Sequence, residues 1–169
     1  DEVAKNPEML NQMQKQATSQ QQYILSGAKT LKEQGNKVIK TDPKEAIQLY
    51  TKAITNLTEI GSTTAEASTL LKACRLNLAL CHLNTDSNDK AIEICTAILS
   101  THPKDTKALY RRGLAYEKVE KLPESFRDFD TSHKLSPGDA IVGEAAARLK
   151  ALVEALPMDE QEPEADPTP

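Results

Sequence analysis

Two short segments of the sequence pair a lysine with a second polar side chain four positions later. In KALYRRGLAY (residues 107–116) Lys107 precedes Arg111, and in KEQGN (residues 32–36) Lys32 precedes Asn36. Residues four apart share one face of a helix, so each pair presents its donors in one direction. Lysine as a point charge and arginine as a forked donor both bind acidic groups. We expect Arg112, one step round the helix from Arg111, to be an ordinary surface residue.

The other residue types that carry chemistry form no recognisable site in the sequence. Cys74, Cys81 and Cys95 lie in apolar helical segments without a CxxC pair, so we interpret them as buried, reduced thiols. The three histidines are far apart and match no metal-ligand spacing. We find no Ser/His/Asp arrangement, no acid–base pair in a motif and no phosphate-binding glycine loop. The sequence therefore predicts no catalytic residue, no metal and no cofactor, and we expect the segment not to be an enzyme.

Composition favours one soluble, mainly helical domain. The 169 residues are 27% charged and 38% hydrophobic, with six glycines. Aromatic residues make up 4% and tryptophan is absent, which leaves little for stacking nucleic-acid bases. The net charge of −4 is concentrated in the last thirteen residues, which carry five acidic groups and no basic one, so the rest has no broad positive face for nucleic acid.

No stretch of the sequence approaches the roughly 18 apolar residues that a membrane span needs. We therefore expect no direct membrane insertion by this segment. The first residue is Asp rather than Met, and we expect the sequence to be a segment of a longer protein.

An internal repeat organises the chain. Ala79 lies thirty-four positions before Gly113, and the same offset relates four further pairs, namely Ala91 with Ser125, Cys95 with Phe129, Ile98 with Ser132, and Pro103 with Pro137. A third copy begins near Gly35, and its distance to Ala79 is ten residues longer, which we assign to two helices each longer by more than a turn. This period, with small residues where helices cross, is typical of tetratricopeptide repeats.

The predicted fold class is all-α, with three tetratricopeptide helix hairpins and a C-terminal capping helix in a right-handed superhelical solenoid. We expect an apolar stripe on the capping helix at Ile141, Ala145, Leu149, Leu152 and Leu156. The predicted helices span residues 20–40 and 43–60, 64–84 and 88–101, 104–119 and 123–135, and 138–155. The predicted domains are a polar N-terminal segment, helical or disordered, at 1–19, the repeat domain at 20–156, and a disordered acidic tail at 157–169.

In such a stack the first helix of each hairpin lines one groove. Read in register, these helices present Lys32 and Asn36, then Asn77, then Lys107 and Arg111. Here the sequence resembles the tetratricopeptide domains with a carboxylate clamp, whose motif is Lys-x-x-x-Asn, then Asn, then Lys-x-x-x-Arg. All five positions match, and the resemblance covers about residues 28–155.

The resemblance implies a protein-interaction module that binds the C-terminal Glu-Glu-Val-Asp tail of Hsp70 and Hsp90 chaperones. A terminal aspartate presents two carboxylates, so several donors must converge on it. Lys32, Lys107 and Arg111 would bind the acidic groups. Asn36 and Asn77, each both donor and acceptor, would fix the terminal carboxylate and a peptide group.

Two stretches indicate a group within this family. The long first repeat and the run LLKACRLNLALCHL (70–83) resemble both the tetratricopeptide arm of large immunophilins and the plant-type receptors of the endoplasmic reticulum or chloroplast outer envelope. NPEML (6–10) and QQYILSGAKTLKEQGN (21–36) favour the plant-type receptors. The resemblance implies a co-chaperone or a docking receptor in protein targeting. The implied localisation is cytoplasmic, or the cytosolic face of an organelle membrane through an anchor outside this segment.

Three alternatives remain open at this stage. The segment could be the regulatory arm of an enzyme such as a peptidyl-prolyl isomerase. It could be a scaffold that binds an internal partner segment without a free carboxylate. The acidic tail could also fold back on the groove as a competitor.

Overall fold

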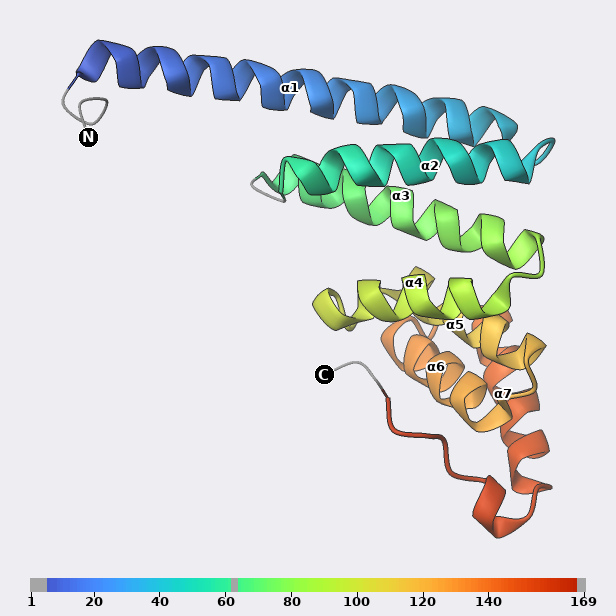
Figure 1. Ribbon diagram of the computed structural model, residues 1–169. Coiled ribbons are helices and arrows are strands. Elements are labelled where there is room, and N and C mark those ends of the chain that lie inside the picture. Colours follow the sequence, from blue (N-terminus) through green and yellow to red (C-terminus); the bar gives the residue numbers. More distant parts are fainter. Residues whose placement is uncertain (1–5, 62–63, 167–169) are drawn as a thin grey trace. The chain divides into compact units, whose positions relative to one another are not determined.

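The computed structural model describes residues 6–61 and 64–166, and the regular elements of this part of the chain are all helices (Figure 1). Seven α helices are followed by a short 3-10 helix: α1 (Pro7–Val38), α2 (Pro43–Glu59), α3 (Ala65–Asn84), α4 (Asn88–Thr101), α5 (Thr106–Lys118), α6 (Leu122–Leu135), α7 (Ala140–Glu154) and η2 (Met158–Glu160). The chain forms two compact units, one up to Cys74 and one from Arg75 on, so the two halves of α3 belong to different units. The predicted all-α class is confirmed, with hairpins α1–α2, α3–α4 and α5–α6 followed by α7.

Aspartate side chains cap three of these helices. The carboxylate of Asp42 accepts from the backbone N–H of Glu45 at 3.0 Å, directly before Pro43 at the start of α2. Asp105 and Asp139 cap α5 and α7 in the same way, at 3.0 and 3.2 Å. Each cap satisfies an N–H group that has no partner inside the helix, which fixes where the helix begins.

In the first unit, α1 packs along α2 at a point where only a small residue fits. A Cβ atom added to Gly35 would lie 2.8 Å from the ring of Tyr50, which is fully buried. The core beside this crossing is apolar and includes Ala28, Ala53 and Leu57, with Leu70 and Cys74 from the first half of α3. Close packing at a glycine therefore sets the distance between α1 and α2.

The second unit contains an equivalent close contact between a glycine and an aromatic ring. A Cβ atom added to Gly113 on α5 would lie 2.9 Å from the ring of Phe129 on α6. The hydroxyl of Ser125 also donates to the carbonyl of Gly113 at 2.8 Å. At the equivalent positions of the preceding hairpin, Ala79 and Cys95 are both fully buried. Four of the five pairs related by the thirty-four-residue offset thus occupy buried positions, whereas Pro103 and Pro137 are exposed and follow the ends of α4 and α6.

The ten additional residues lengthen helices, but only one of the two helices is longer by more than a turn, whereas the sequence predicts this for both. Helix α3 has 20 residues and its counterpart α5 has 13, whereas α2 has 17 and its counterparts α4 and α6 have 14, which is less than one turn of difference. Residues 62 and 63, between α2 and α3, lie outside the described residues.

Helix α1 begins much earlier than the predicted residue 20. The side chain of Asn6 accepts from the N–H groups of Glu8 and Met9, and Pro7 follows it at the first helical position. An asparagine cap followed by proline is a strong signal for the start of a helix. The prediction missed it because the residues that follow show no apolar periodicity. For residues 7–19 the helical alternative therefore holds, and residues 1–5 lie outside the described part.

Two predictions for the C-terminal part differ from the structure. Helix α7 buries the stripe Val142, Ala146, Leu149 and Val153, whereas Ile141 is 67% exposed. The helix carries two neighbouring apolar stripes that share Leu149, and the sequence alone does not decide between them. The tail, predicted to be disordered, forms η2 and then an extended stretch to residue 166, and residues 167–169 lie outside the described part.

Candidate peptide-binding site

Lys32 and Asn36 lie one turn apart on α1, within the first unit. Lys32 is half-buried and lines a cavity of about 420 Å³ together with residues of α3 that include Thr69 and Ala73. The side chain of Asn36 is exposed, and its Oδ1 accepts a hydrogen bond of 2.6 Å from the hydroxyl of Tyr50. Because the Tyr50 ring is fixed against Gly35, this bond holds the Asn36 amide in a defined orientation.

Asn77, Lys107 and Arg111 lie in the second unit, on α3 and α5. Nη1 of Arg111 donates to the backbone carbonyl of Leu76, directly beside Asn77. Arg111 and Asn77 are half-buried, and Lys107, one turn before Arg111, is exposed. The hydrogen bond to α3 restricts the guanidinium to one position, so the Arg111 donors are ordered before any ligand arrives.

Lys107 and Arg111 share a cavity of about 500 Å³ that has a mostly apolar wall. The apolar residues come from α3, α5 and α7, namely Leu80, Tyr110, Leu114, Ile141 and Val142. Asp139 also lines the cavity, and its carboxylate is engaged in capping α7. Two cations beside an apolar wall suit a ligand that carries both an acidic group and an apolar side chain.

The structure thus brings the five predicted residues into two groups, each within its own unit. One group consists of Lys32 and Asn36, and the other of Asn77, Lys107 and Arg111. Lys32 and Asn36 share one face of α1, and Lys107 and Arg111 share one face of α5, as their spacing predicts.

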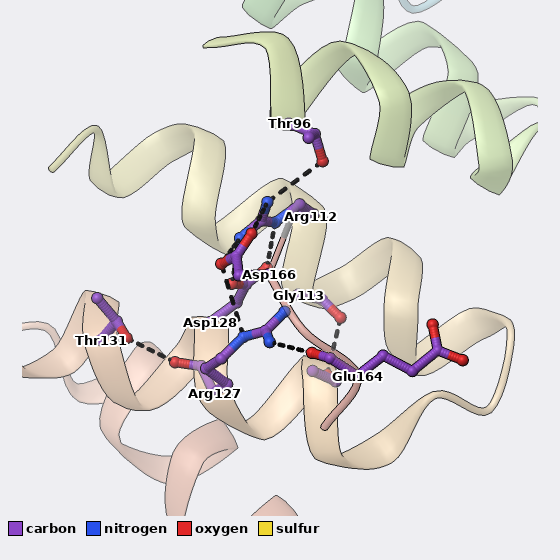
Figure 2. A network of polar contacts seen from close by, with 9 residues as sticks. Thr96, Arg112, Gly113, Arg127, Asp128, Thr131, Glu164 and Asp166 are labelled. Carbon is purple, nitrogen blue, oxygen red and sulfur yellow. Dashed lines mark hydrogen bonds and ion pairs between the residues drawn. The ribbon is translucent and has the colours of Figure 1, made fainter. Parts of the chain in front are cut away.

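The prediction for Arg112 was wrong. Its side chain is 1% exposed, and its Nε and Nη2 donate to the two carboxylate oxygens of Asp128 at 2.7 and 2.8 Å (Figure 2). A sequence signal for this pair does exist: Arg112 and Asp128 are sixteen positions apart, as are Gly113 and Phe129, which meet at the α5–α6 crossing. Arg112 is therefore part of the helix packing and faces a different direction from Arg111.

The cysteines are free and buried, as the sequence predicts. Burial raises the pKa of Cys74 and of Cys81 to about 11 and that of Cys95 to about 12, while nearby Lys32 and Arg111 act in the opposite direction. Thiols with such pKa values stay protonated and are poor nucleophiles at neutral pH.

Residues 6–61 and 64–166 contain neither a metal-ligand cluster nor a membrane-spanning helix. No group of three or more His, Cys, Asp or Glu residues in this part of the chain is arranged to hold a metal ion. None of the described helices combines the length and apolar character needed to cross a bilayer.

Comparison with known proteins finds similar sequences in several differently named proteins. Outer envelope protein 61 of Arabidopsis thaliana is 32% identical over 82% of this chain and 25% of its own length. FK506-binding protein 59 of Drosophila melanogaster is 32% identical over 68% of this chain and 26% of its own length. The human mitochondrial import receptor subunit TOM34 is 33% identical over 66% of this chain and 36% of its own length. The chain thus spans about a quarter of the first two relatives, and no family model matches it.

Solved structures give the same fold. The C-terminal TPR-containing domain of a Plasmodium falciparum FK506-binding protein has a TM-score of 0.71 at 22% identity and covers 79% of this chain and 93% of its own. The first TPR of Spaghetti (RPAP3), bound to the HSP90 peptide SRMEEVD, has a TM-score of 0.65 at 24% identity over 77% and 95%. The second TPR domain of human RPAP3, with the HSP70 peptide SGPTIEEVD, has a TM-score of 0.61 at 24% identity over 77% and 98%. The helix hairpins, their small-residue crossings and these similarities identify the chain as a tetratricopeptide repeat domain.

Proposed function

We propose that this domain binds the C-terminal acidic tail of Hsp70 and Hsp90 chaperones through Lys32, Asn36, Asn77, Lys107 and Arg111. The observation that carries the proposal is the pair Lys107 and Arg111, which line one cavity, with Arg111 ordered by its bond to the carbonyl beside Asn77. The RPAP3 domains, which share the fold, are in complex with peptides that end in Glu-Glu-Val-Asp.

The chemistry of the five side chains suits such a ligand. The terminal aspartate carries a side-chain carboxylate and the carboxylate of the chain end, and the two preceding glutamates add further acidic groups. Lysine and arginine supply charge-assisted hydrogen bonds, each worth about 1.5–3 kcal/mol. The asparagines supply amide donors and acceptors for the chain end and a peptide group. Apolar side chains of the peptide would contact the wall formed by residues such as Tyr110 and Leu114.

A titration with paired peptides tests the proposal. The peptide SRMEEVD with a free C-terminus is compared by isothermal titration calorimetry with the same peptide carrying a C-terminal amide. Because the amide removes one carboxylate and nothing else, we expect it to bind at least about tenfold more weakly. Equal affinities would contradict a clamp that recognises the chain end.

The role we propose is that of a co-chaperone or chaperone-docking receptor. The names of outer envelope protein 61 and of the import receptor subunit TOM34 support a receptor at an organelle surface. The corresponding localisation is the cytosol or the cytosolic face of an organelle membrane. Fractionation of cells that produce the full-length protein tests this part of the proposal, and recovery from an organelle lumen would contradict it.

A second candidate role is that of a regulatory arm attached to a peptidyl-prolyl isomerase. The observation that favours it is the similarity to FK506-binding protein 59, of which the chain covers 26%. The peptide-binding chemistry is the same in both roles, and the sequence of the full-length protein distinguishes them.

A further inference from the structure

The guanidinium of Arg112 uses all five of its N–H donors, and the chain's own tail accepts two of these bonds. Nε and one N–H of Nη2 donate to Asp128, and one N–H of Nη1 donates to the Thr96 hydroxyl at 3.2 Å. The remaining two reach the carboxylate of Asp166, from Nη1 at 3.3 Å and from Nη2 at 3.0 Å. Figure 2 shows Arg112 lying between these three acceptors, which come from α4, α6 and the tail. Arginine has no donor beyond these five, so the tail completes the set.

Asp166 also supplies negative charge beside two arginine side chains. Burial alone would lower the pKa of Arg112, but hydrogen bonds and charge from Asp128 and then Asp166 raise it on balance. Arg127 brings a second cation, with its Nε 3.7 Å from a carboxylate oxygen of Asp166. Two arginines thus contact the carboxylate of Asp166, and its removal would take one negative charge away from a buried and a half-buried cation.

The residues before Asp166 are held as a bound peptide would be. Nη1 of Arg127 donates to the Glu164 carbonyl at 2.7 Å, and the Glu164 N–H donates to the Glu124 carboxylate at 3.4 Å. Nζ of Lys121 forms an ion pair of 3.0 Å with the Glu164 carboxylate. Both acidic side chains and the backbone between them therefore have partners on α6 or at its start.

From these contacts we propose that Arg112, Arg127 and Lys121, with Thr96 and Glu124, form a second carboxylate-binding site, here called the Arg112 site. Its ligand is an acidic Glu-x-Asp segment, and its occupant in this chain is Glu164–Ala165–Asp166. The site is separate from the cavity that Lys107 and Arg111 share, because none of the tail residues 157–166 lines that cavity. In this proposal the described part of the tail is a ligand of the Arg112 site and not a competitor for the predicted clamp.

A variant that empties the site without altering it provides the test. Glu164→Gln with Asp166→Asn removes the two carboxylates in the full chain and leaves every arginine in place. The matched control is Asp159→Asn with Glu162→Gln, which removes the same charge from exposed positions of the same tail. The probe is a blocked peptide of sequence PEADP, and its counterpart PQANP lacks the charges. Binding is followed by NMR at the Arg112 Nε–H resonance, which reports the site directly.

We expect the emptied variant to bind PEADP at least tenfold more tightly than the wild type or the control, because a tethered tail competes at an effective concentration near the millimolar range. The counterpart peptide PQANP should not bind to the emptied variant, the control variant or the wild type. We also expect the melting temperature of the emptied variant to fall below that of the control, since the tail links Arg112 on α5 to Arg127 on α6. Equal PEADP binding by all three proteins, or no binding by the emptied variant, would overturn the Arg112 site.

Discussion

At the scale of single residues, adjacent arginines on α5 have different tasks. Arg112 is buried in ion pairs with Asp128 and Asp166, whereas Arg111 is half-buried and faces a cavity with Lys107. One step along a helix turns a side chain by about 100°, which is enough to separate a residue that packs from one that can meet a ligand. The residue type does not distinguish the two arginines, but their hydrogen-bond and ion-pair partners do.

Replacement of Arg111 should weaken peptide binding and leave the fold intact. Each charge-assisted hydrogen bond contributes about 1.5–3 kcal/mol. Because Arg111→Ala removes such a bond, we expect it to lower the affinity for SRMEEVD roughly 10- to 150-fold. Lys118→Ala is the control, because Lys118 is an exposed cation at the end of the same helix and does not line the cavity. Calorimetry would contradict the prediction if both variants bound as the wild type does.

His82 predicts a dependence of stability on pH. Its side chain is 8% exposed, and burial, together with the charge of Lys90, lowers its pKa from 6.5. The unfolded chain therefore binds the proton more readily, and this part of the free energy of unfolding is lost as the pH falls below 6.5. Urea unfolding at pH 7.5 and 5.5 should show a smaller loss for His82→Gln than for the wild type. An equal loss for the two proteins would exclude His82 as a source of the effect.

At the scale of the elements, glycines at crossings fix how closely paired helices approach. Gly113→Ala would place a methyl group 2.9 Å from the Phe129 ring, and we expect it to cost about 1–3 kcal/mol through displaced packing. Gly27→Ala on α1 is the contrasting change, because an added Cβ meets nothing within 4 Å there. It should stabilise the chain by about 0.5–1 kcal/mol through helix propensity. Thermal unfolding followed by circular dichroism should shift in opposite directions, and a loss of stability in Gly27→Ala as large as in Gly113→Ala would contradict the role of the crossing.

Most helix boundaries could be predicted because local signals mark them. Asp42 with Pro43, and the aspartates before α5 and α7, satisfy backbone donors next to the residues that carry them, so sequence neighbours suffice. The five proposed clamp residues likewise follow from the repeat register. The start of α1 was missed because residues 7–19 are polar and lack a periodic apolar face. The contact of Arg112 with Asp166 was missed because the two residues are 54 positions apart and one lies outside the repeats.

At the scale of the whole molecule, we propose two carboxylate-binding sites in the domain. The first is the proposed clamp, with cations and amides from α1, α3 and α5. The second is the Arg112 site, which the chain fills with its own acidic segment. The two sites predict different responses, because emptying the Arg112 site should change stability and binding of PEADP while affinity for a chaperone tail stays the same.

The most direct test of the proposed clamp is whether the free C-terminal carboxylate of the peptide interacts with the side-chain amide of Asn77. Calorimetry on the wild type and on Asn77→Ala, each titrated with SRMEEVD as the free acid and as the C-terminal amide, completes a double-mutant cycle. If Asn77 binds the terminal carboxylate, amidation should weaken binding to the wild type about tenfold or more and weaken binding to Asn77→Ala much less, because the contact is already absent. Amidation without effect on the wild type, or the same loss in both proteins, would contradict recognition of the terminal carboxylate by Asn77.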